Sequence, residues 1–293
     1  MLKQILLKPG GETLTYRETG IGCNVLVLIH GNMTSSKHWD LLMENFPGEY
    51  KIVAPDLRGF GGSSYNNPVN SFKDFSEDIR LFVDALGLKK FAIAGWSAGG
   101  AIAMQFAIDH PGFVSKLILQ SSVGIKGFPM LKSNEKGQPV PGEFIKTRQD
   151  IDNDPQLQKI ISAISSKNRE FLRAVWNKLI YTQKQPEPEK YEQYLDDILT
   201  QRNLKDVYYS LVRFNISNED NRVVPGTGEV DKIRIPTLVI HGDRDFIIPL
   251  ETAEQIKKGI KENAELAVLE NCGHSPLTDS LDRLIGLYVD FID

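Results

Sequence analysis

Runs of consecutive apolar residues recur along the chain, and segments with helical periodicity separate them. An apolar run without polar alternation is typical of a strand buried on both faces, as in a parallel sheet covered by helices. We therefore predict strands at residues 25–29, 51–54, 91–94, 117–119, 237–240 and, from a weaker run, 265–269.

Helical patterns occupy the intervals between these runs. After Ser71, apolar residues recur at spacings of three and four until Gly87, and Ser71 with Asp74 predicts a capping box. Strands that alternate with helices indicate βαβ units, an α/β fold class and a mostly parallel sheet. Further elements are expected as a hairpin over residues 5–19 and as helices at about 98–110, 250–261 and from 280 onwards.

One long interval departs from this alternation. Residues 125–231 contain no strong buried-strand run, and they carry amphipathic stretches instead. We expect a helical insertion between two strands of the sheet. The predicted organisation is a core domain of residues 1–124 and 232–293, with a helical cap (lid) of residues 125–231.

The composition narrows the class of protein. The 293 residues include 34 basic and 38 acidic side chains, and the formal charge of -4 argues against a nucleic-acid partner. Two cysteines are too few for a disulfide framework and fit a cytoplasmic location. No signal-type or membrane-spanning apolar run is present, so no membrane span is expected. Neither a metal site nor a cofactor is expected.

The clearest chemical motif is Gly-Trp-Ser-Ala-Gly at residues 95–99, directly after a predicted buried strand and directly before a predicted helix. A sharp strand-to-helix turn forces Ser97 into a strained backbone conformation and requires small residues two positions away on either side. We predict that Ser97 is a nucleophile. The alternative is a glycine-rich turn with an exposed serine.

A serine hydroxyl needs an adjacent base, and the base needs an acid that holds its tautomer. Among the five histidines, His274 lies in a loop after the last predicted strand, where open α/β sheets build their sites. Two carboxylates, Asp243 and Asp245, follow the strand at residues 237–240. We favour Asp245, which lies deeper in the loop, and expect Asp243 to make turn or arginine contacts.

The oxyanion of an acyl-transfer reaction needs backbone donors that are already in place. One is expected to be the Ala98 N–H at the start of the helix after Ser97. The second is expected from the loop at residues 30–33, with Asn32 as the first choice and Met33 as the alternative.

Substrate contacts are expected from Trp96 and Met33, which flank these positions. Aromatic residues of the cap, among them Phe144 and Trp176, could line an apolar acyl site. The alternative for each is packing inside the cap or against the core, because apolar helical stripes usually face a core.

Ser97, Asp245 and His274, in this chain order, resemble the nucleophile, acid and base of the α/β-hydrolase superfamily. The similarity covers roughly residues 20–124 and 232–293, and it includes Asp-Leu-Arg-Gly-Phe-Gly-Gly-Ser at residues 56–63. The resemblance implies an α/β-hydrolase fold with a sheet of about eight strands. It also implies that the cap helices lie over the active site and line an acyl pocket.

Differences from other branches of this superfamily narrow the range of candidate activities. Ser97 stands where haloalkane dehalogenases and epoxide hydrolases use aspartate, and the elbow of prolyl iminopeptidases and the HGGG loop of many lipases are absent. Carboxylesterases, carbon–carbon bond hydrolases and cofactor-free perhydrolases remain. The His-Gly-Asn-Met stretch with the Gly-Trp-Ser elbow also looks like intracellular polyhydroxyalkanoate depolymerases.

The predicted function is therefore a serine hydrolase that cleaves small-molecule or oligomeric carboxylic esters through an acyl-enzyme. The alternatives are an intracellular poly(3-hydroxybutyrate) or other hydroxyacyl ester depolymerase, a carbon–carbon bond hydrolase, and a ligand receptor on the hydrolase fold.

Overall fold

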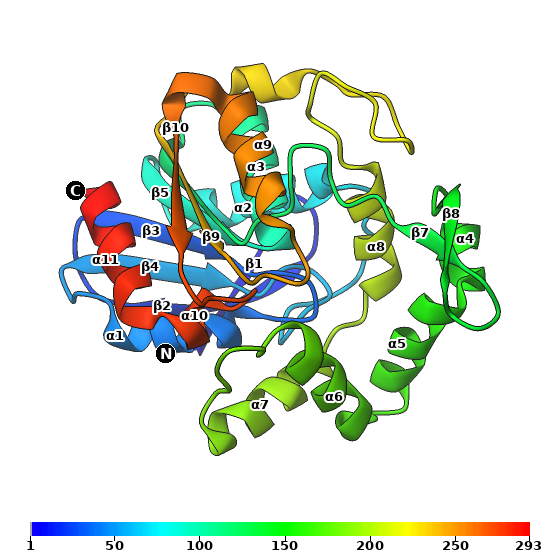
Figure 1. Ribbon diagram of the computed structural model, residues 1–293. Helices are drawn as coiled ribbons and strands as arrows, with labels where there is room; N and C mark the ends of the chain where they lie inside the picture. Colours follow the sequence, from blue (N-terminus) through cyan, green and yellow to red (C-terminus); the bar gives the residue numbers. More distant parts are fainter. Residues whose placement is uncertain (1) are drawn as a thin grey trace.

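A computed structural model describes residues 2–293 and is built around one eight-stranded sheet (Figure 1). The strand order is β1-β2-β4-β3-β5-β6-β9-β10. Strand β2 pairs antiparallel with β1 and β4, and the other neighbours are parallel, which confirms the mostly parallel sheet of about eight strands. The strands are β1 (Leu2–Leu6), β2 (Thr13–Thr19), β3 (Asn24–Ile29), β4 (Tyr50–Pro55), β5 (Phe91–Trp96), β6 (Val114–Gln120), β9 (Thr237–Gly242) and β10 (Ala264–Leu269).

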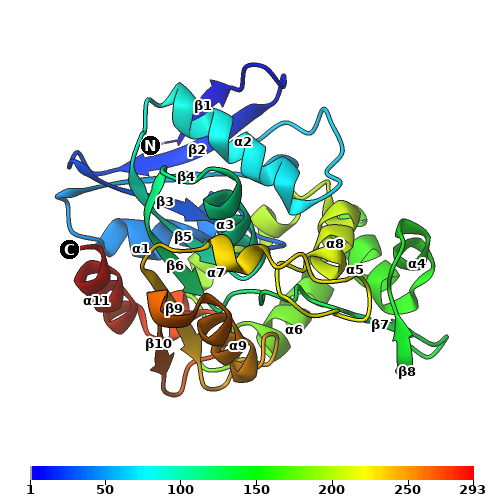
Figure 2. The same cartoon turned by 90° about the horizontal axis from the view of Figure 1, so that it is seen from above.

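Both faces of the sheet are buried, which explains the continuous apolar runs. In β3, Val27 and Ile29 belong to one buried cluster, whereas Leu26 and Leu28 belong to the other. Figures 1 and 2 show the helices on the two faces. Residues of α2 (Phe72–Ala85), α3 (Ala98–Asp109) and α9 (Leu250–Ile260) lie in the first cluster, and residues of α1 (Asp40–Asn45) and α11 (Leu281–Ile292) lie in the second.

Two local predictions are confirmed. Strands β1 and β2 form the N-terminal hairpin. Ser71 and Asp74 form the capping box at the start of α2. The short elements of the core are the 3₁₀ helices η1 (Ser36–Trp39), η2 (Glu229–Lys232) and η3 (Lys261–Asn263) and the helix α10 (Pro276–Asp279). No helix within residues 2–293 has the length and apolar character that crossing a membrane requires.

Residues 125–231, which we call the cap segment, run between β6 and β9 and add no strand to the eight-stranded sheet within the described residues. The expected amphipathic helices are present, but the segment also contains an antiparallel pair, β7–β8, that the prediction of a helical insertion did not include. Neither strand contains a buried residue, so no buried apolar run marks them. The elements are β7 (Leu131–Ser133), β8 (Pro139–Phe144), α4 (Arg148–Asn153), α5 (Pro155–Ser165), α6 (Arg169–Leu179), α7 (Pro188–Ile198) and α8 (Leu204–Arg213).

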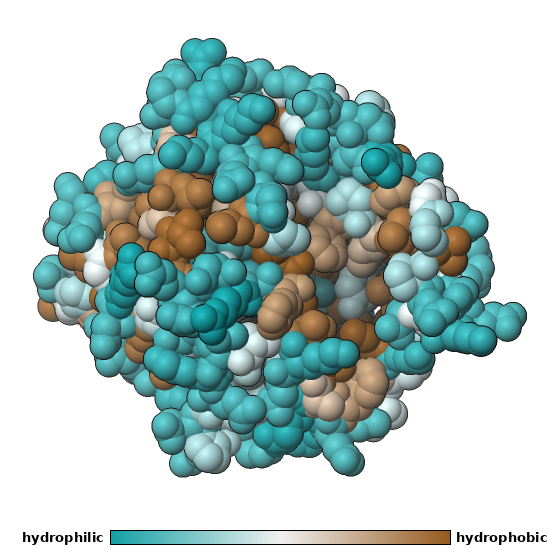
Figure 3. Space-filling view, viewed as in Figure 1, coloured by the Kyte–Doolittle hydropathy of each residue, from teal (hydrophilic) through white to brown (hydrophobic). Residues whose placement is uncertain are grey.

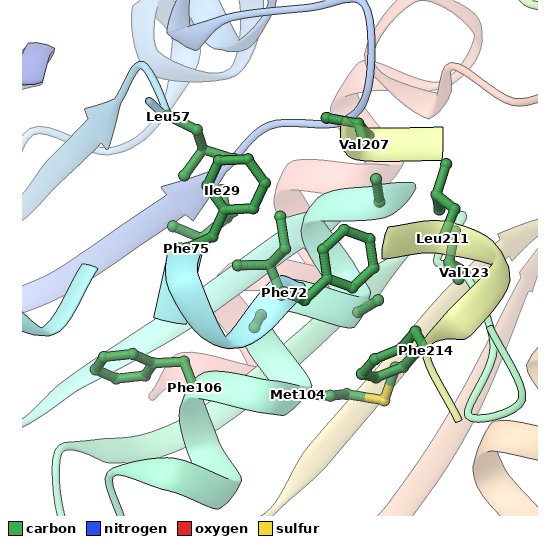
Figure 4. Packing of buried hydrophobic residues seen from close by; sticks show 14 of the residues in the cluster. Ile29, Leu57, Phe72, Phe75, Met104, Phe106, Val123, Val207, Leu211 and Phe214 are labelled. Carbon is green, nitrogen blue, oxygen red and sulfur yellow. The ribbon is translucent and has the colours of Figure 1, made fainter. Parts of the chain in front are cut away.

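Helix α8 connects the cap segment to the core through apolar packing (Figure 4). Val207 and Leu211 of this helix belong to the same buried cluster as Phe72 of α2. The rings of Phe72 and Phe214, which follows α8, have their centroids 5.5 Å apart. The cap segment therefore shares the hydrophobic core of the sheet and is not a separate apolar unit.

Candidate active site

Ser97 lies at the turn between β5 and α3 with φ 56° and ψ -121°. This conformation is strained for a residue with a Cβ atom. The turn also leaves no room beside it: a Cβ on Gly95 would lie 2.2 Å from the carbonyl oxygen of Gly99, and a Cβ on Gly99 would lie 2.2 Å from that of Ile29. The predicted strain at Ser97 and the need for small neighbours are both confirmed.

His274 lies in the loop after β10 and is almost fully buried. Its Nδ1 lies 2.8 Å from Oδ2 of Asp245, in the loop after β9. The indole Nε1–H of Trp96 donates to the backbone oxygen of His274 at 2.8 Å. These contacts fix the imidazole at the carboxyl ends of the strands, beside the turn that carries Ser97.

Asp245 is fixed independently of His274. Its Oδ1 accepts the backbone N–H groups of Ile247 at 2.8 Å and Ile248 at 2.9 Å. Burial raises the pKa of Asp245, but the charge and hydrogen bond of His274, together with the Ile248 amide, outweigh burial, and the pKa lies below its ordinary value. The carboxylate is therefore ionised at neutral pH.

Of the two carboxylates after β9, Asp245 contacts the His274 imidazole, whereas Asp243 binds the backbone of the loop that carries His274. Asp243 Oδ1 accepts the backbone N–H of Cys272 at 3.1 Å. The backbone N–H of Arg244 donates to the Cys272 oxygen at 2.9 Å. Asp243 thus joins the loop after β9 to the loop that carries His274, as a turn contact.

The loop at residues 30–33 lies against the turn of residues 95–99 that carries Ser97, which we call the serine turn. A Cβ on Gly31 would lie 3.1 Å from Cβ and 3.7 Å from Oγ of Ser97. The two residues considered as oxyanion donors differ in which of their groups is hydrogen-bonded to Gln201. The Met33 N–H donates to Oε1 of Gln201 at 3.0 Å, whereas Asn32 is held through its side-chain oxygen.

A cavity of about 190 Å³ lies between the serine turn and the cap segment. Figure 3 shows apolar residues around a hollow on this face of the molecule. Its wall includes Ser97, Ala98, His274 and most of the predicted substrate contacts, and its other residues are predominantly apolar. The lining consists of Gly31, Asn32, Met33, Thr34, Trp96, Ser97, Ala98, Val123, Phe128, Met130, Ile160, Val175, Trp176, Leu179, Ile180, Tyr208, Leu211, Ile247, Ile248 and His274.

Phe144 is a correction to the predicted set of substrate contacts. It lies at the end of β8 and lines a different surface hollow, together with Lys126 and Arg222. The Arg222 guanidinium lies over its ring, 5.8 Å from the centroid. Phe144 is absent from the cavity beside Ser97 because the unpredicted β7–β8 pair places it elsewhere.

The other histidines at the ends of strands are engaged with the backbone. The N–H of Leu57 donates to Nε2 of His30 at 2.9 Å, and His30 Nδ1 lies 2.8 Å from the Gly31 oxygen. His241 Nε2 lies 2.8 Å from the Ile248 oxygen, and burial lowers the pKa of His241. Burial lowers the pKa of His30 as well, so burial favours the neutral form of both imidazoles.

Sequence reasoning missed a second histidine–carboxylate pair. His38 Nδ1 lies 3.0 Å from Oδ2 of Asp197, and the His38 ring stacks on Tyr194 at 4.4 Å. Asp197 and Tyr194 belong to α7, so the pair joins the cap segment to η1 of the core. The two residues are 159 positions apart, and neither lies in a motif that could have indicated the contact.

The fold and this site define a class of protein. A mostly parallel sheet with a strained serine at the turn after a central strand, and with a histidine–aspartate pair in later loops, is the architecture of an α/β hydrolase. Residues 24–280 match the family model described as alpha/beta hydrolase fold. The chain belongs to this family.

The names of similar proteins describe more than one kind of activity. The chain is 27% identical over 298 residues to a 2-hydroxy-6-oxononadienedioate/2-hydroxy-6-oxononatrienedioate hydrolase of Paraburkholderia phymatum, covering 99% of this chain and 95% of the relative. It is 28% identical over 286 residues to Lipase 1 of Psychrobacter immobilis, covering 96% and 81%. An esterase structure from Exiguobacterium antarcticum superposes with a TM-score of 0.76 at 20% identity, covering 100% of this chain and 99% of that one, which supports the fold.

Proposed function

We propose that this chain is a serine hydrolase that cleaves carboxylic esters through an acyl-enzyme, with Ser97 as nucleophile, His274 as base and Asp245 as its acid partner. The observation that carries the proposal is the 2.8 Å contact between Asp245 and His274, next to a cavity that Ser97 and His274 both line. A buried aspartate on Nδ1 leaves Nε2 of the imidazole as the nitrogen that accepts a proton.

In the first half of the reaction, Ser97 Oγ attacks the ester carbonyl carbon and its proton passes to His274. The tetrahedral intermediate collapses when the carbon–oxygen bond to the alcohol breaks, and the proton on His274 goes to the leaving alkoxide. In the second half, His274 takes a proton from water, the hydroxide attacks the acyl carbon, and Ser97 leaves with that proton. Asp245 stabilises the imidazolium in both halves.

The oxyanion is bound by the backbone N–H groups of Ala98 and Asn32. The Ala98 N–H lies in the first turn of α3, where helix N–H groups lack acceptors within the helix. Asn32 is favoured over Met33 because the Met33 N–H already donates to Gln201. Ser97 and both donor residues line the same cavity.

The wall of the cavity favours a neutral, apolar acyl group. Apart from His274, its lining residues include no aspartate, glutamate, lysine or arginine. A buried carboxylate without a cationic partner would carry a large desolvation cost. Trp96 and Met33 lie beside Ser97, and Trp176 and Leu211 come from the cap segment, so an acyl chain would be enclosed from both sides.

A second candidate function is carbon–carbon bond hydrolysis, because a relative that matches 99% of the chain is named as a dioate hydrolase. A dioate carries two carboxylates, and the cavity supplies no arginine or lysine for either. We therefore favour ester hydrolysis. Turnover of a vinylogous diacid faster than of neutral esters would reverse this order.

The test of the proposal is the kinetics of Ser97→Ala on p-nitrophenyl esters of acetate, butyrate and octanoate. We expect multiple turnovers by the wild type and a loss of kcat of at least about 10³-fold in the variant. Ser76→Ala is the matched control, because Ser76 is a buried serine on α2 whose hydroxyl has no hydrogen-bond partner among residues 2–293. Near wild-type activity of Ser97→Ala would refute the proposal, and a single slow turnover by the wild type would favour a ligand receptor.

A further inference from the structure

Gln201 of the cap segment contacts the loop that supplies the second oxyanion donor. It lies in the turn between α7 and α8 and is 5% exposed. Its Oε1 accepts the Met33 N–H at 3.0 Å, and its Nε2 donates to Oδ1 of Asn32 at 2.9 Å and to Oδ1 of Asn203 at 3.0 Å. One buried side chain therefore engages both residues considered as oxyanion donors.

The orientation of this amide follows from its partners. A backbone N–H can only donate, so the group that faces Met33 must be the oxygen of Gln201. The NH₂ group then faces two side-chain oxygens, and the three contacts are mutually consistent. A reversed amide would place two donors against each other at Met33 and lose that hydrogen bond.

The turn that carries Gln201 is attached to the core by contacts that do not involve the loop at residues 30–33, which we call the oxyanion loop. Asn203 Nδ2 donates to the Arg58 oxygen at 2.6 Å, and the Arg202 N–H donates to the Gly59 oxygen at 2.8 Å. Thr200 Oγ1 accepts the Gly61 N–H at 2.9 Å. Gln201 therefore projects from a turn that is already fixed on a neighbouring core loop.

The oxyanion loop itself needs support. Met33 has φ 60°, in the left-handed region that costs a non-glycine residue about 1 kcal/mol or more. The hydrogen bond that the Met33 N–H donates to Gln201 stabilises this conformation, and the contact of Gln201 with the Asn32 side chain restrains the preceding residue.

We propose that Gln201 is a positioning residue for the oxyanion site: it binds the Met33 amide and the Asn32 side chain, and thereby keeps the Asn32 N–H directed at the oxyanion. This inference rests on the proposed function. Through Gln201, the packing of the cap segment determines the geometry of the acyl-transfer site, although Gln201 itself does not line the cavity.

The experiment compares Gln201→Ala with Thr200→Ala, which removes a cap–core hydrogen bond one residue away and leaves the oxyanion loop untouched. We expect Gln201→Ala to lower kcat on p-nitrophenyl butyrate by about 10- to 100-fold with KM changed less than threefold, since small displacements of a preorganised group are costly. Binding of an aryl boronic acid, whose adduct with serine mimics the oxyanion, should weaken in parallel. Thr200→Ala should keep its kcat within threefold.

Gln201→Glu is the second variant, and it retains the acceptor for Met33 while removing both donated hydrogen bonds. We expect kcat to fall at least as far as in Gln201→Ala, because a carboxylate near the oxyanion also repels it. Equal kcat values for Gln201→Ala and Thr200→Ala, or a loss carried only by KM, would overturn the inference. An active Ser97→Ala enzyme would instead refute the proposed function, so the two failures are distinguishable.

Discussion

Replacing Asp245 with asparagine keeps the shape of the side chain but changes what it offers to His274. The backbone N–H groups of Ile247 and Ile248 both donate to Oδ1, at 2.8 and 2.9 Å. In Asp245→Asn, the carboxamide oxygen must remain on this side, because an NH₂ group there would lose both hydrogen bonds. The NH₂ group therefore faces Nδ1 of His274.

This arrangement selects the wrong tautomer of the base. His274 Nδ1 has to accept the hydrogen bond from the carboxamide, so the ring proton moves to Nε2 and no lone pair is left to take the proton of Ser97. The equivalent change in a serine protease triad lowers kcat by about 10⁴-fold. We expect a loss of about 10³- to 10⁴-fold here, which corresponds to about 4–5 kcal/mol of transition-state stabilisation.

The assay is kcat on p-nitrophenyl butyrate at pH 7, with Asp243→Asn as the matched control. Asp243 is a carboxylate in the same loop that binds the Cys272 amide and not the imidazole. Its variant should keep kcat within tenfold. The reasoning would be refuted by an Asp245→Asn enzyme that retains more than a tenth of wild-type kcat, or by an Asp243→Asn enzyme that loses more kcat than Asp245→Asn does.

Three further predictions follow from the packing, the cavity and the charge of the site. Gly99→Ala should lower the free energy of unfolding by about 1–3 kcal/mol, because its Cβ would lie 2.2 Å from the Ile29 oxygen. Gly286→Ala on α11, where the Cβ would meet open space, should instead raise Tm, and equal shifts of Tm in the two variants would contradict this prediction. Val175→Trp should move the kcat/KM optimum of an acyl-length series towards shorter chains, because Val175 lines the cavity, and an unchanged profile would count against the assigned acyl site. Folding lowers the pKa of Asp245, so the ionised carboxylate stabilises the fold above the unfolded pKa of about 3.9, and this stabilisation is lost as the pH falls below that value. The difference in Tm between the wild type and Asp245→Asn should therefore narrow below pH 4. A constant difference in Tm from pH 3 to 7 would argue against this prediction.

The buried sheet could be predicted from the sequence because it is encoded locally. Strands β3, β5 and β9 are apolar on both faces, so each appears as an uninterrupted run that needs no knowledge of its neighbours. The serine turn is local too, since Ser97 and its two glycines lie within five consecutive residues. The weaker apolar run at residues 265–269 also forms a strand, β10.

Exposed elements and long-range polar contacts could not be predicted in this way. Strands β7 and β8 pair at the surface, so no apolar run marks them, and the position of Phe144 was misjudged with them. Gln201 contacts Asn32 across 169 positions, and nothing in the residues around it distinguishes it from a surface glutamine. Such contacts follow from how the cap segment packs on the core, which a single sequence does not encode in a short motif.

Mass-spectrometric mapping of a fluorophosphonate label tests the central claim most directly, because the probe reacts only with a serine that is activated as a nucleophile. We predict one label per chain, on the peptide that contains Ser97, and loss of labelling in both Ser97→Ala and His274→Ala. A label on another residue, or undiminished labelling of Ser97 in His274→Ala, would contradict the account.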